Sequence, residues 1–218
     1  MNFQPNVDTS IRYEQIGGIM ICGYNWGGNP NILGRGTSDS FFSDARYGNR
    51  YRNRIIEWFS LWGFPLARVP GTEGYLENSI SQTNWLPTQT VSLHGSNALD
   101  SCISHAENFN LHLDYFKPKV LLLMGKALID ALNTPVVQNE LIRIAGQPLS
   151  LDYLYDYPDA HNHKLKKFRV TFQKYEKMQV ICFPHPTGSR GLSNDYIAGF
   201  RSLIEPIFKG FMFERNAG

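Results

Sequence analysis

Three polar, turn-forming segments hold the side chains of this sequence that are best suited to chemistry. They are residues 23–28 (GYNWGG), 83–87 (TNWLP) and 184–191 (PHPTGSRG). The amide of Asn25 cannot take up a proton as a carboxylate does, but it can hold an attacking water in place. The imidazole of His185 can donate a hydrogen bond to a leaving group as negative charge develops there, and it does so as a neutral ring. These two residue types favour a hydrolysis that depends on orientation and electrostatics.

Each of the three segments follows a predicted strand. Residues 18–22 (GIMIC) and 178–183 (MQVICF) are compact apolar runs of strand length, and residues 80–84 are a weaker strand candidate. The aliphatic run 119–124 (KVLLLM) predicts a central parallel strand that ends at Gly125. Because the carboxyl ends of parallel strands meet at one edge, where ligands bind in open α/β sheets, we expect all three segments at the same edge.

Helical periodicity between the strands predicts an α/β fold. The predicted helices cover residues 51–62, 97–113, 127–132 and 193–208. Pro206 should kink or break the last of these. Alternation over residues 168–172 and a turn at residues 175–177 predict a hairpin that leads into the last strand. We therefore expect a three-layer α/β/α sandwich around a central, mainly parallel four-stranded sheet.

Length, cysteines and apolar runs narrow the class of protein. The 218 residues, 42% of them hydrophobic, are enough for one substantial core, so we expect a single domain over residues 1–218. The three cysteines, Cys22, Cys102 and Cys182, lie far apart without CxxC spacing, which favours a reducing cytoplasm and no disulfide, zinc or iron–sulfur site. The amino terminus lacks a basic start followed by an apolar stretch, so we expect neither secretion nor a membrane span.

The order of the three segments resembles the uracil-DNA glycosylase superfamily. There, a Gly-x-Asn-Pro-Gly or Gly-x-Asp-Pro loop follows the first core strand, and His-Pro-Ser follows the last. The corresponding segments here are residues 23–25 (GYN), 83–84 (TN), 121–126 (LLLMGK) and 185–187 (HPT). The resemblance spans residues 17–205, with Trp26 in place of the usual proline and Thr187 in place of serine. It implies a monofunctional DNA glycosylase, which flips a base out of DNA and hydrolyses its bond to the sugar without metal or cofactor.

The resemblance implies a role for several residues, and each has a plainer alternative. Asn25 and His185 would be catalytic, whereas alone they are a turn residue and a loop residue. Asn84 would read the polar edge of the flipped base, and its alternative is a cap or turn amide. Tyr24, Trp26 and Trp85 would stack on the base, although core packing is the commoner fate of an aromatic ring.

DNA is the implied partner, bound by a protein that acts as a monomer. The candidate phosphate contacts are Arg46, Arg50, Lys126 and Ser189. Arg190 or Leu192, in the loop after His185, would fill the space left by the flipped nucleotide; a flexible surface loop is the alternative. Two basic runs, one at residues 46–54 and one at residues 164–177, could follow a phosphate backbone or simply face solvent.

The sequence is compatible with two classes of substrate base, a bulky modified pyrimidine and uracil. Gly27 and Gly28 remove side-chain bulk after Asn25, which favours a roomy pocket for a bulky modified pyrimidine. Glucosylated hydroxymethylcytosine of phage DNA is such a base, and its removal would make the protein an antiphage enzyme. Trp26 could refill the space, which favours uracil and repair. Two other functions are a catalytically silent nucleic-acid-binding module of the same fold and an unrelated small-molecule enzyme, whose affinity would not fall steeply with salt.

Overall fold

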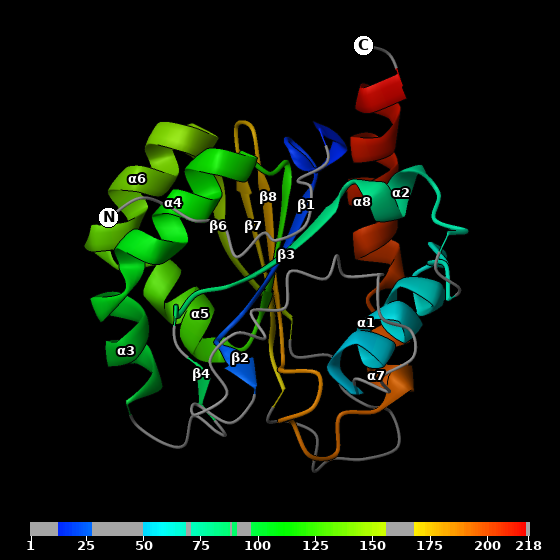
Figure 1. The fold of residues 1–218 in the computed structure, drawn as a ribbon, viewed down its shortest axis with the longest axis horizontal. Coiled ribbons are helices and arrows are strands. Elements are labelled where there is room, and N and C mark those ends of the chain that lie inside the picture. The colour runs from blue at the N-terminus through cyan, green and yellow to red at the C-terminus, as the bar shows by residue number, and fades with distance from the viewer. Residues whose placement is uncertain are drawn as a thin grey trace.

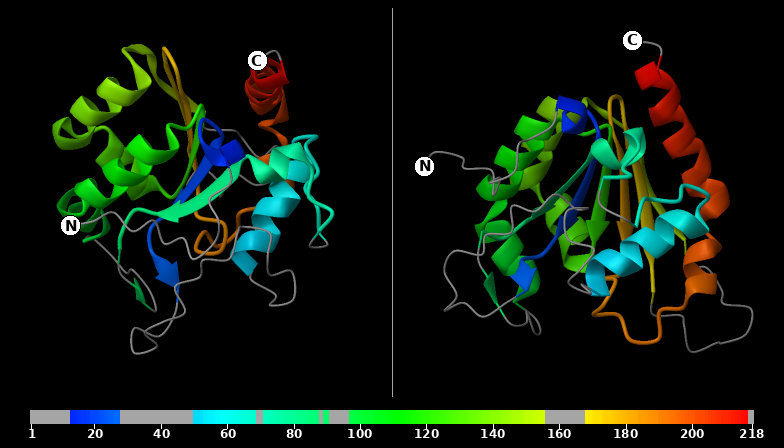
Figure 2. Two further views of the ribbon diagram at one scale, coloured as in Figure 1. Left: turned by 45° about the horizontal axis from the view of Figure 1, so that its top comes forward. Right: turned by 45° about the vertical axis from the view of Figure 1, so that its right-hand side comes forward.

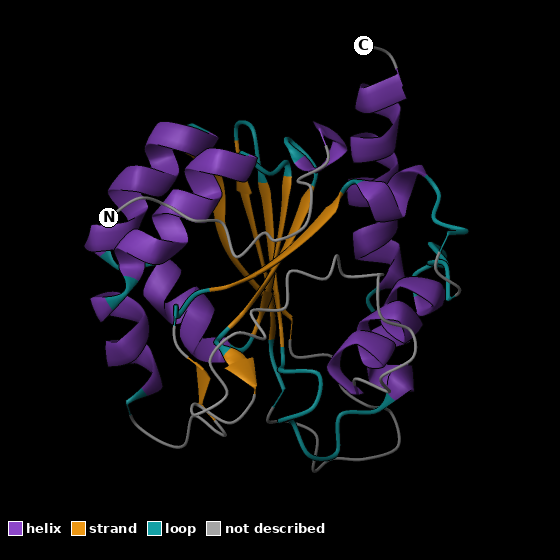
Figure 3. Ribbon diagram, viewed as in Figure 1, coloured by secondary structure: helices purple, strands orange, loops and turns teal. Residues whose placement is uncertain are grey.

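A computed structural model of the protein describes residues 13–27, 50–68, 71–87, 89–90, 97–155 and 168–216. These residues form an α/β fold, with a six-stranded mixed sheet between two groups of helices (Figures 1 and 3). The strand order is β3-β1-β5-β8-β7-β6. The strands are β1 (Ile19–Gly23), β3 (Ile80–Asn84), β5 (Val120–Met124), β6 (Pro148–Tyr155), β7 (Val170–Tyr175) and β8 (Gln179–Phe183). The α/β class predicted from the sequence is confirmed.

The predicted four-stranded sheet is wrong in its strand count. Four strands, β3, β1, β5 and β8, are parallel to one another. Strand β7 then pairs antiparallel with β8, as the predicted hairpin requires, and β6 pairs antiparallel with β7. Every residue of β1 and of β5 is buried, because helices cover both faces of the sheet. This double burial is the reason that these strands are continuous aliphatic runs.

One helical layer packs on the sheet face that carries Ile19, Ile21 and Leu122. It contains α1 (Arg50–Leu61), α7 (Asn194–Ala198) and α8 (Arg201–Asn216). The turned views in Figure 2 show these three elements together on one side of the sheet. Trp58, Phe59 and Trp62, which recur with the predicted helical spacing, are completely buried in this layer.

The second helical layer packs on the opposite face, against Met20, Cys22 and Leu121. It contains α3 (Ala98–Ser104), α4 (Ala106–Phe116), α5 (Lys126–Leu132) and α6 (Pro135–Ala145). The shorter elements are η1 (Tyr13–Gln15), α2 (Tyr75–Asn78), β2 (Trp26–Gly27) and β4 (Gln89–Thr90), of which β2 and β4 pair in parallel. No helix in the described part of the chain is long and apolar enough to cross a membrane.

Two of the predicted helices are interrupted, and helices α2 and α6 were not predicted. The helix expected over residues 97–113 divides at His105, which ends α3 and precedes α4. The closing helix breaks at Gly199 and Phe200, between α7 and α8, and it then continues through Pro206. Helix α6 begins with a proline at its first position and buries Val137, Leu141 and Ala145, four residues apart.

Candidate active site

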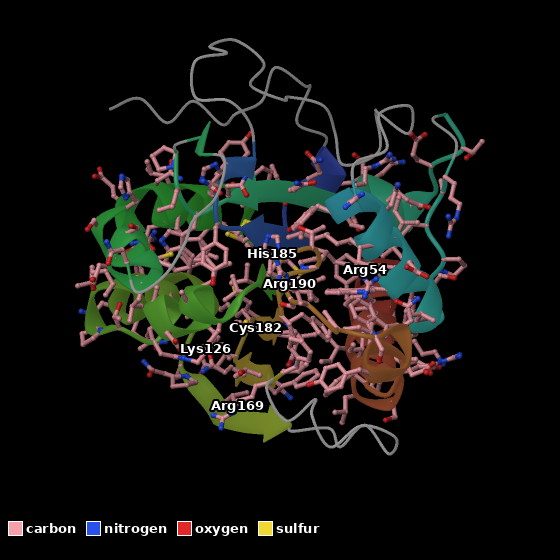
Figure 4. All side chains as sticks on the ribbon, turned by 90° about the horizontal axis from the view of Figure 1, so that it is seen from below. Arg54, Lys126, Arg169, Cys182, His185 and Arg190 are labelled. Atoms are coloured by element: carbon pink, nitrogen blue, oxygen red, sulfur yellow. The ribbon has the colours of Figure 1, made fainter. Side chains whose placement is uncertain are left out.

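The three polar segments meet at the carboxyl ends of the parallel strands. The end of β1 lies beside the end of β3, since Gly23 is in register with Asn84. The end of β5 lies beside the end of β8, since Met124 is in register with Phe183. Figure 4 views this edge and shows His185 near its centre. Parallel pairing therefore brings Asn25, Asn84 and His185, which are far apart in sequence, to one edge of the sheet.

Gly23 lets the Asn84 side chain fold over the end of β1. A Cβ atom at Gly23 would lie 2.7 Å from Asn84 Oδ1 and 3.5 Å from the Tyr51 hydroxyl, so a larger residue would displace the amide. Asn108 fixes the main chain at Asn84 and Trp85, because its Nδ2 donates to the carbonyls of Asn84 (3.3 Å) and Trp85 (2.8 Å). The Asn84 amide is thus held in one place at the edge.

The Asn84 amide is also an unused donor. The residue is 7% exposed, and its Nδ2 is buried without a hydrogen-bond partner among the described residues. A buried N–H group that lacks an acceptor costs about 1–3 kcal/mol. A ligand with an acceptor atom at this point would recover that free energy, which is the physical basis for assigning Asn84 to ligand recognition.

Gly125 plays the same role for Tyr24 as Gly23 does for Asn84. It has a φ of +141°, and a Cβ there would overlap the Tyr24 ring. The Tyr24 hydroxyl accepts a hydrogen bond of 2.9 Å from the backbone N–H of Ala127, at the start of α5. Burial raises the pKa of Tyr24 well above its ordinary value, so the phenol stays neutral. The ring is therefore fixed against the sheet edge.

The main chain on either side of Asn25 is hydrogen-bonded to neighbouring segments. The N–H of Trp85 donates to the Gly23 carbonyl (2.9 Å), and the N–H of Leu86 donates to the Tyr24 carbonyl (2.8 Å). Beyond Asn25, strand β2 pairs with β4. Gly27, which the sequence places in a turn, is part of β2. Gly28 lies outside the described residues, and the structure describes the Trp26 backbone without its side chain.

His185 lies two residues beyond β8 and is held by its own loop. Its Nδ1 accepts hydrogen bonds from the backbone N–H groups of Gly188 (2.9 Å) and Thr187 (3.3 Å). The ring lies between Tyr24, whose centroid is 6.2 Å away at 26°, and Tyr51, whose centroid is 5.6 Å away at 49°. Burial lowers the pKa of His185 below its ordinary 6.5. The imidazole is thus neutral at pH 7, and because Nδ1 accepts, its proton is on Nε2.

The structure corrects the role predicted for Trp85. Its side chain is fully buried, stacks on Phe109 at a centroid distance of 3.8 Å, and donates from Nε1 to the Cys102 carbonyl at 2.7 Å. A fully buried ring that is stacked on a core residue, with its only donor engaged, cannot stack on a flipped base. Trp85 is a core residue that supports the main chain next to Asn84.

The structure also corrects the role predicted for Leu192. Its side chain is only 6% exposed and belongs to the core beneath α1, so it cannot act as a wedge in DNA. Arg190, two residues earlier, is exposed, and Ser189 is half-buried with its N–H bonded to the His185 carbonyl (3.2 Å). Of the two wedge candidates, only Arg190 stays compatible with the role.

The predicted phosphate contacts are spread around the edge. Lys126, at the start of α5, is exposed and forms an ion pair of 2.5 Å with Asp130 one turn later. Arg50 is exposed at the first position of α1. Figure 4 shows Lys126, Arg190 and Arg169 on this face. Arg46 lies outside the described residues.

Tyr51 is the site residue that the sequence did not single out. The sequence places Tyr51 in the first turn of a predicted helix, where it does lie. In addition, its ring contacts His185 and its hydroxyl lies beside Gly23. Burial raises the pKa of Tyr51 far above its ordinary value, so it too is neutral. Within the described ranges, no three His, Cys, Asp or Glu side chains cluster as metal ligands, and the three cysteines are buried free thiols.

No family model matches the chain, and no curated protein sequence is significantly similar to it. The resemblance to the glycosylase superfamily therefore stays one of short segments in a fixed order. The geometry adds a fixed neutral imidazole and a half-buried asparagine at one sheet edge. It also adds a buried amide there whose Nδ2 has no acceptor among the described residues.

Proposed function

We propose that the protein is a monofunctional DNA glycosylase, which flips a modified base out of DNA and hydrolyses its N-glycosidic bond to leave an abasic site. The observation that carries this proposal is the state of His185. Its Nδ1 is occupied by the N–H of Gly188, so the neutral ring has its remaining proton on Nε2. A neutral donor that is fixed before the reaction begins is suited to a leaving group that becomes an anion.

Cleavage of the bond between sugar and base separates charge in a defined way. Positive charge develops on the sugar, and negative charge develops on the departing base. The Nε2–H of His185 stabilises the base anion, a contribution on the scale of about 3 kcal/mol for one preorganised donor. The imidazole need not be protonated for this, which agrees with its lowered pKa. The imidazole keeps its proton and the base leaves as an anion. The water that adds to the sugar loses one proton to solvent, and solvent protonates the base after it is released.

Asn25 and Asn84 perform the other two tasks. Asn25, which follows β1 at the same edge, orients the water that attacks the sugar. Asn84 recognises the polar edge of the base, since its buried Nδ2 lacks an acceptor among the described residues. Tyr24 lies beside His185 and packs against the base. Arg50, Lys126, Arg190 and Ser189 contact the phosphate backbone around this edge.

The proposed substrate is a bulky modified pyrimidine such as glucosylated hydroxymethylcytosine, which gives the protein a role in defence against phage. Support comes from the glycines of the first segment, because Gly27 in β2 and Gly28 after it add no side chain beside Asn25. We further propose that the protein acts as a monomer in the reducing cytoplasm, where its buried thiols stay free.

An abasic-site assay on matched DNAs tests this proposal. Duplex and single-stranded oligonucleotides would carry uracil, hydroxymethylcytosine or its glucosylated form at one position, with an unmodified cytosine control. Strand scission in hot alkali and mass spectrometry of the released base would report cleavage. Release of the glucosylated base alone supports the antiphage role, and release of uracil alone replaces it with repair. DNA binding without any release would overturn the catalytic proposal in favour of a binding module.

A further inference from the structure

One face of helix α1 lies along residues 185–194, the segment that contains His185. Three side chains spaced three residues apart, Tyr51, Arg54 and Glu57, lie on this face. The Tyr51 ring contacts the His185 ring, an Arg54 amino group donates to the Leu192 carbonyl, and Glu57 accepts from Asn194 Nδ2 at 2.6 Å. Each successive turn of α1 thus contacts a later part of residues 185–194.

Arg54 is the unusual member of these three, because it is a half-buried cation that binds a neutral carbonyl group. It is half-buried and makes no ion pair with a carboxylate of the described residues; its hydrogen bond is to the neutral carbonyl of Leu192. Its Nε is buried and has no acceptor within the same part of the chain. A cation bound in this way contributes little to stability, because desolvation of the guanidinium opposes the gain from a single hydrogen bond. The free energy of folding therefore does not explain the hydrogen bond between Arg54 and the Leu192 carbonyl.

Short hydrogen-bonded steps connect Arg54 to the catalytic imidazole. Arg54 holds the Leu192 carbonyl, and the Leu192 N–H donates to the Ser189 carbonyl at 3.3 Å. The Ser189 N–H donates to the His185 carbonyl at 3.2 Å. The resulting turn places the Gly188 N–H against His185 Nδ1. Figure 4 shows Arg54, Arg190 and His185 at the same edge.

We propose that Arg54 is a positioning residue for His185: its guanidinium anchors the end of the loop at Leu192, and this keeps the Gly188 N–H on Nδ1. The catalytic consequence rests on the proposed glycosylase function, whereas the effect on the imidazole does not. Without the anchor, the loop moves away from Nδ1, and the ring becomes free to exchange its proton between the two nitrogens and to take up a second proton.

The variant Arg54→Met tests this, because it keeps the length and apolar stem of the side chain without its donors. Arg143→Met is the matched control, since Arg143 is exposed on α6 and pairs with Asp114 and Glu140 in the other helical layer. Arg54→Lys is the rescue variant, because an ammonium group can still donate to the Leu192 carbonyl. Arg54→Gln serves in place of Arg54→Met if the latter does not fold.

Nitrogen-15 NMR of histidine-labelled protein reads the imidazole directly, with the His185 signals assigned from the spectrum of His185→Gln. The described groups that contact this ring are the neutral Tyr24 and Tyr51 phenols, the Thr187 hydroxyl and the backbone N–H groups of Thr187 and Gly188. Wild type and Arg143→Met should show the proton on Nε2. Arg54→Met should show mixed tautomers and a His185 pKa shifted upward toward 6.5, and Arg54→Lys should restore the wild-type spectrum.

Kinetics supply the second measurement. On a DNA that the wild type cleaves, Arg54→Met should lower kcat by about 10- to 100-fold with KM nearly unchanged, as expected for a displaced catalytic group. A wild-type His185 spectrum in Arg54→Met would overturn the positioning role, whatever happens to the rate. If the wild type cleaves no DNA but Arg54→Met still shifts the His185 signals, the glycosylase proposal fails and the positioning of the ring by Arg54 stands.

Discussion

The backbone N–H of Gly188 donates a 2.9 Å hydrogen bond to Nδ1 of His185, so the loop after the last parallel strand folds back on the imidazole that it carries. A Cβ at Gly188 would lie 3.2 Å from the same nitrogen, which shows how closely the backbone approaches the ring. The bond selects the Nε2–H tautomer and opposes protonation of Nδ1. Together with burial between two tyrosine rings, it makes His185 a donor that is neutral at physiological pH.

The first prediction concerns pH. Burial lowers the folded-state pKa of His185 below 6.5, so the neutral form that the proposal requires predominates above pH 6.5. With respect to His185, the rate of base release should level off as the pH rises above the folded pKa and fall as the pH drops through it. A pH–rate profile checks this, and a rate that rises in acid through the protonation of His185 would contradict a neutral donor.

The same shift predicts how folding stability changes with pH. Between the folded pKa and 6.5, the unfolded chain binds more protons at this position than the folded chain does. The His185 contribution to the free energy of unfolding is therefore fully present above pH 6.5 and decreases as the pH falls toward the folded pKa. Urea unfolding of the wild type and of His185→Gln across this range measures the difference, which should narrow in acid.

A second prediction separates Asn84 from its neighbour Trp85. Asn84→Ala should change the free energy of unfolding by less than about 1 kcal/mol, because it removes a buried donor that has no acceptor in the described part of the chain. Trp85→Ala should cost about 3–5 kcal/mol, because it empties a stacked core position. Asn84→Ala should nevertheless lose discrimination among bases. Equal losses of stability would return Asn84 to a structural role.

The third prediction concerns Gly125. Gly125→Ala places a Cβ where the Tyr24 ring now lies and forces alanine into a φ of +141°, so it should destabilise the fold by about 1–3 kcal/mol and slow base release. Gly210→Ala is the matched control. Gly210 lies in α8 with open space around it, so alanine should stabilise this helix by about 1 kcal/mol. If Gly125→Ala kept wild-type stability and activity, Tyr24 would have no place in the site.

A fourth prediction concerns binding to phosphate. Arg50→Ala should weaken binding to all DNA sequences alike and reduce the slope of log affinity against log salt by up to about one unit. Arg143→Ala, on α6, is the control and should leave the slope unchanged. If both variants keep the wild-type slope, Arg50 faces solvent and the phosphate contacts lie elsewhere.

Much of the fold and of the shared edge was predictable because buried parallel strands leave a strong sequence signal. The runs 18–22, 119–124 and 178–183 are apolar without interruption, and each is followed by polar residues that parallel pairing brings to one edge. Strand β6 and helices α2 and α6 were not predicted. In α6 a signal was present, because Pro135 begins the helix and Val137, Leu141 and Ala145 recur four residues apart. The closing helix breaks at Gly199, which ends α7, and not at Pro206, which lies inside α8; a local rule for proline does not predict this.

The roles of individual side chains were less predictable, since an aromatic or aliphatic residue after a strand has the same sequence signal whether it faces the site or the core. Trp85 and Leu192 were assigned to the site and lie in the core. Tyr51 was assigned to a helix and lies against His185. The position of α1 beside the His185 loop decides the cases of Tyr51 and Leu192. The packing of Trp85 against α3 and α4 decides the third. Arg54 could not be identified for the same reason.

The most direct test of the central claim is single-turnover base release by the wild type, Asn25→Ala and His185→Ala, with free base and abasic strand quantified together. Asn25→Ala should bind DNA normally and be slower by about 10² to 10⁴. His185→Ala should lose about 2–4 kcal/mol of barrier reduction, and less on bases that are already good leaving groups. Equal rates for all three proteins, or no abasic product from any modified DNA, would contradict the assignment of this sheet edge as a glycosylase active site.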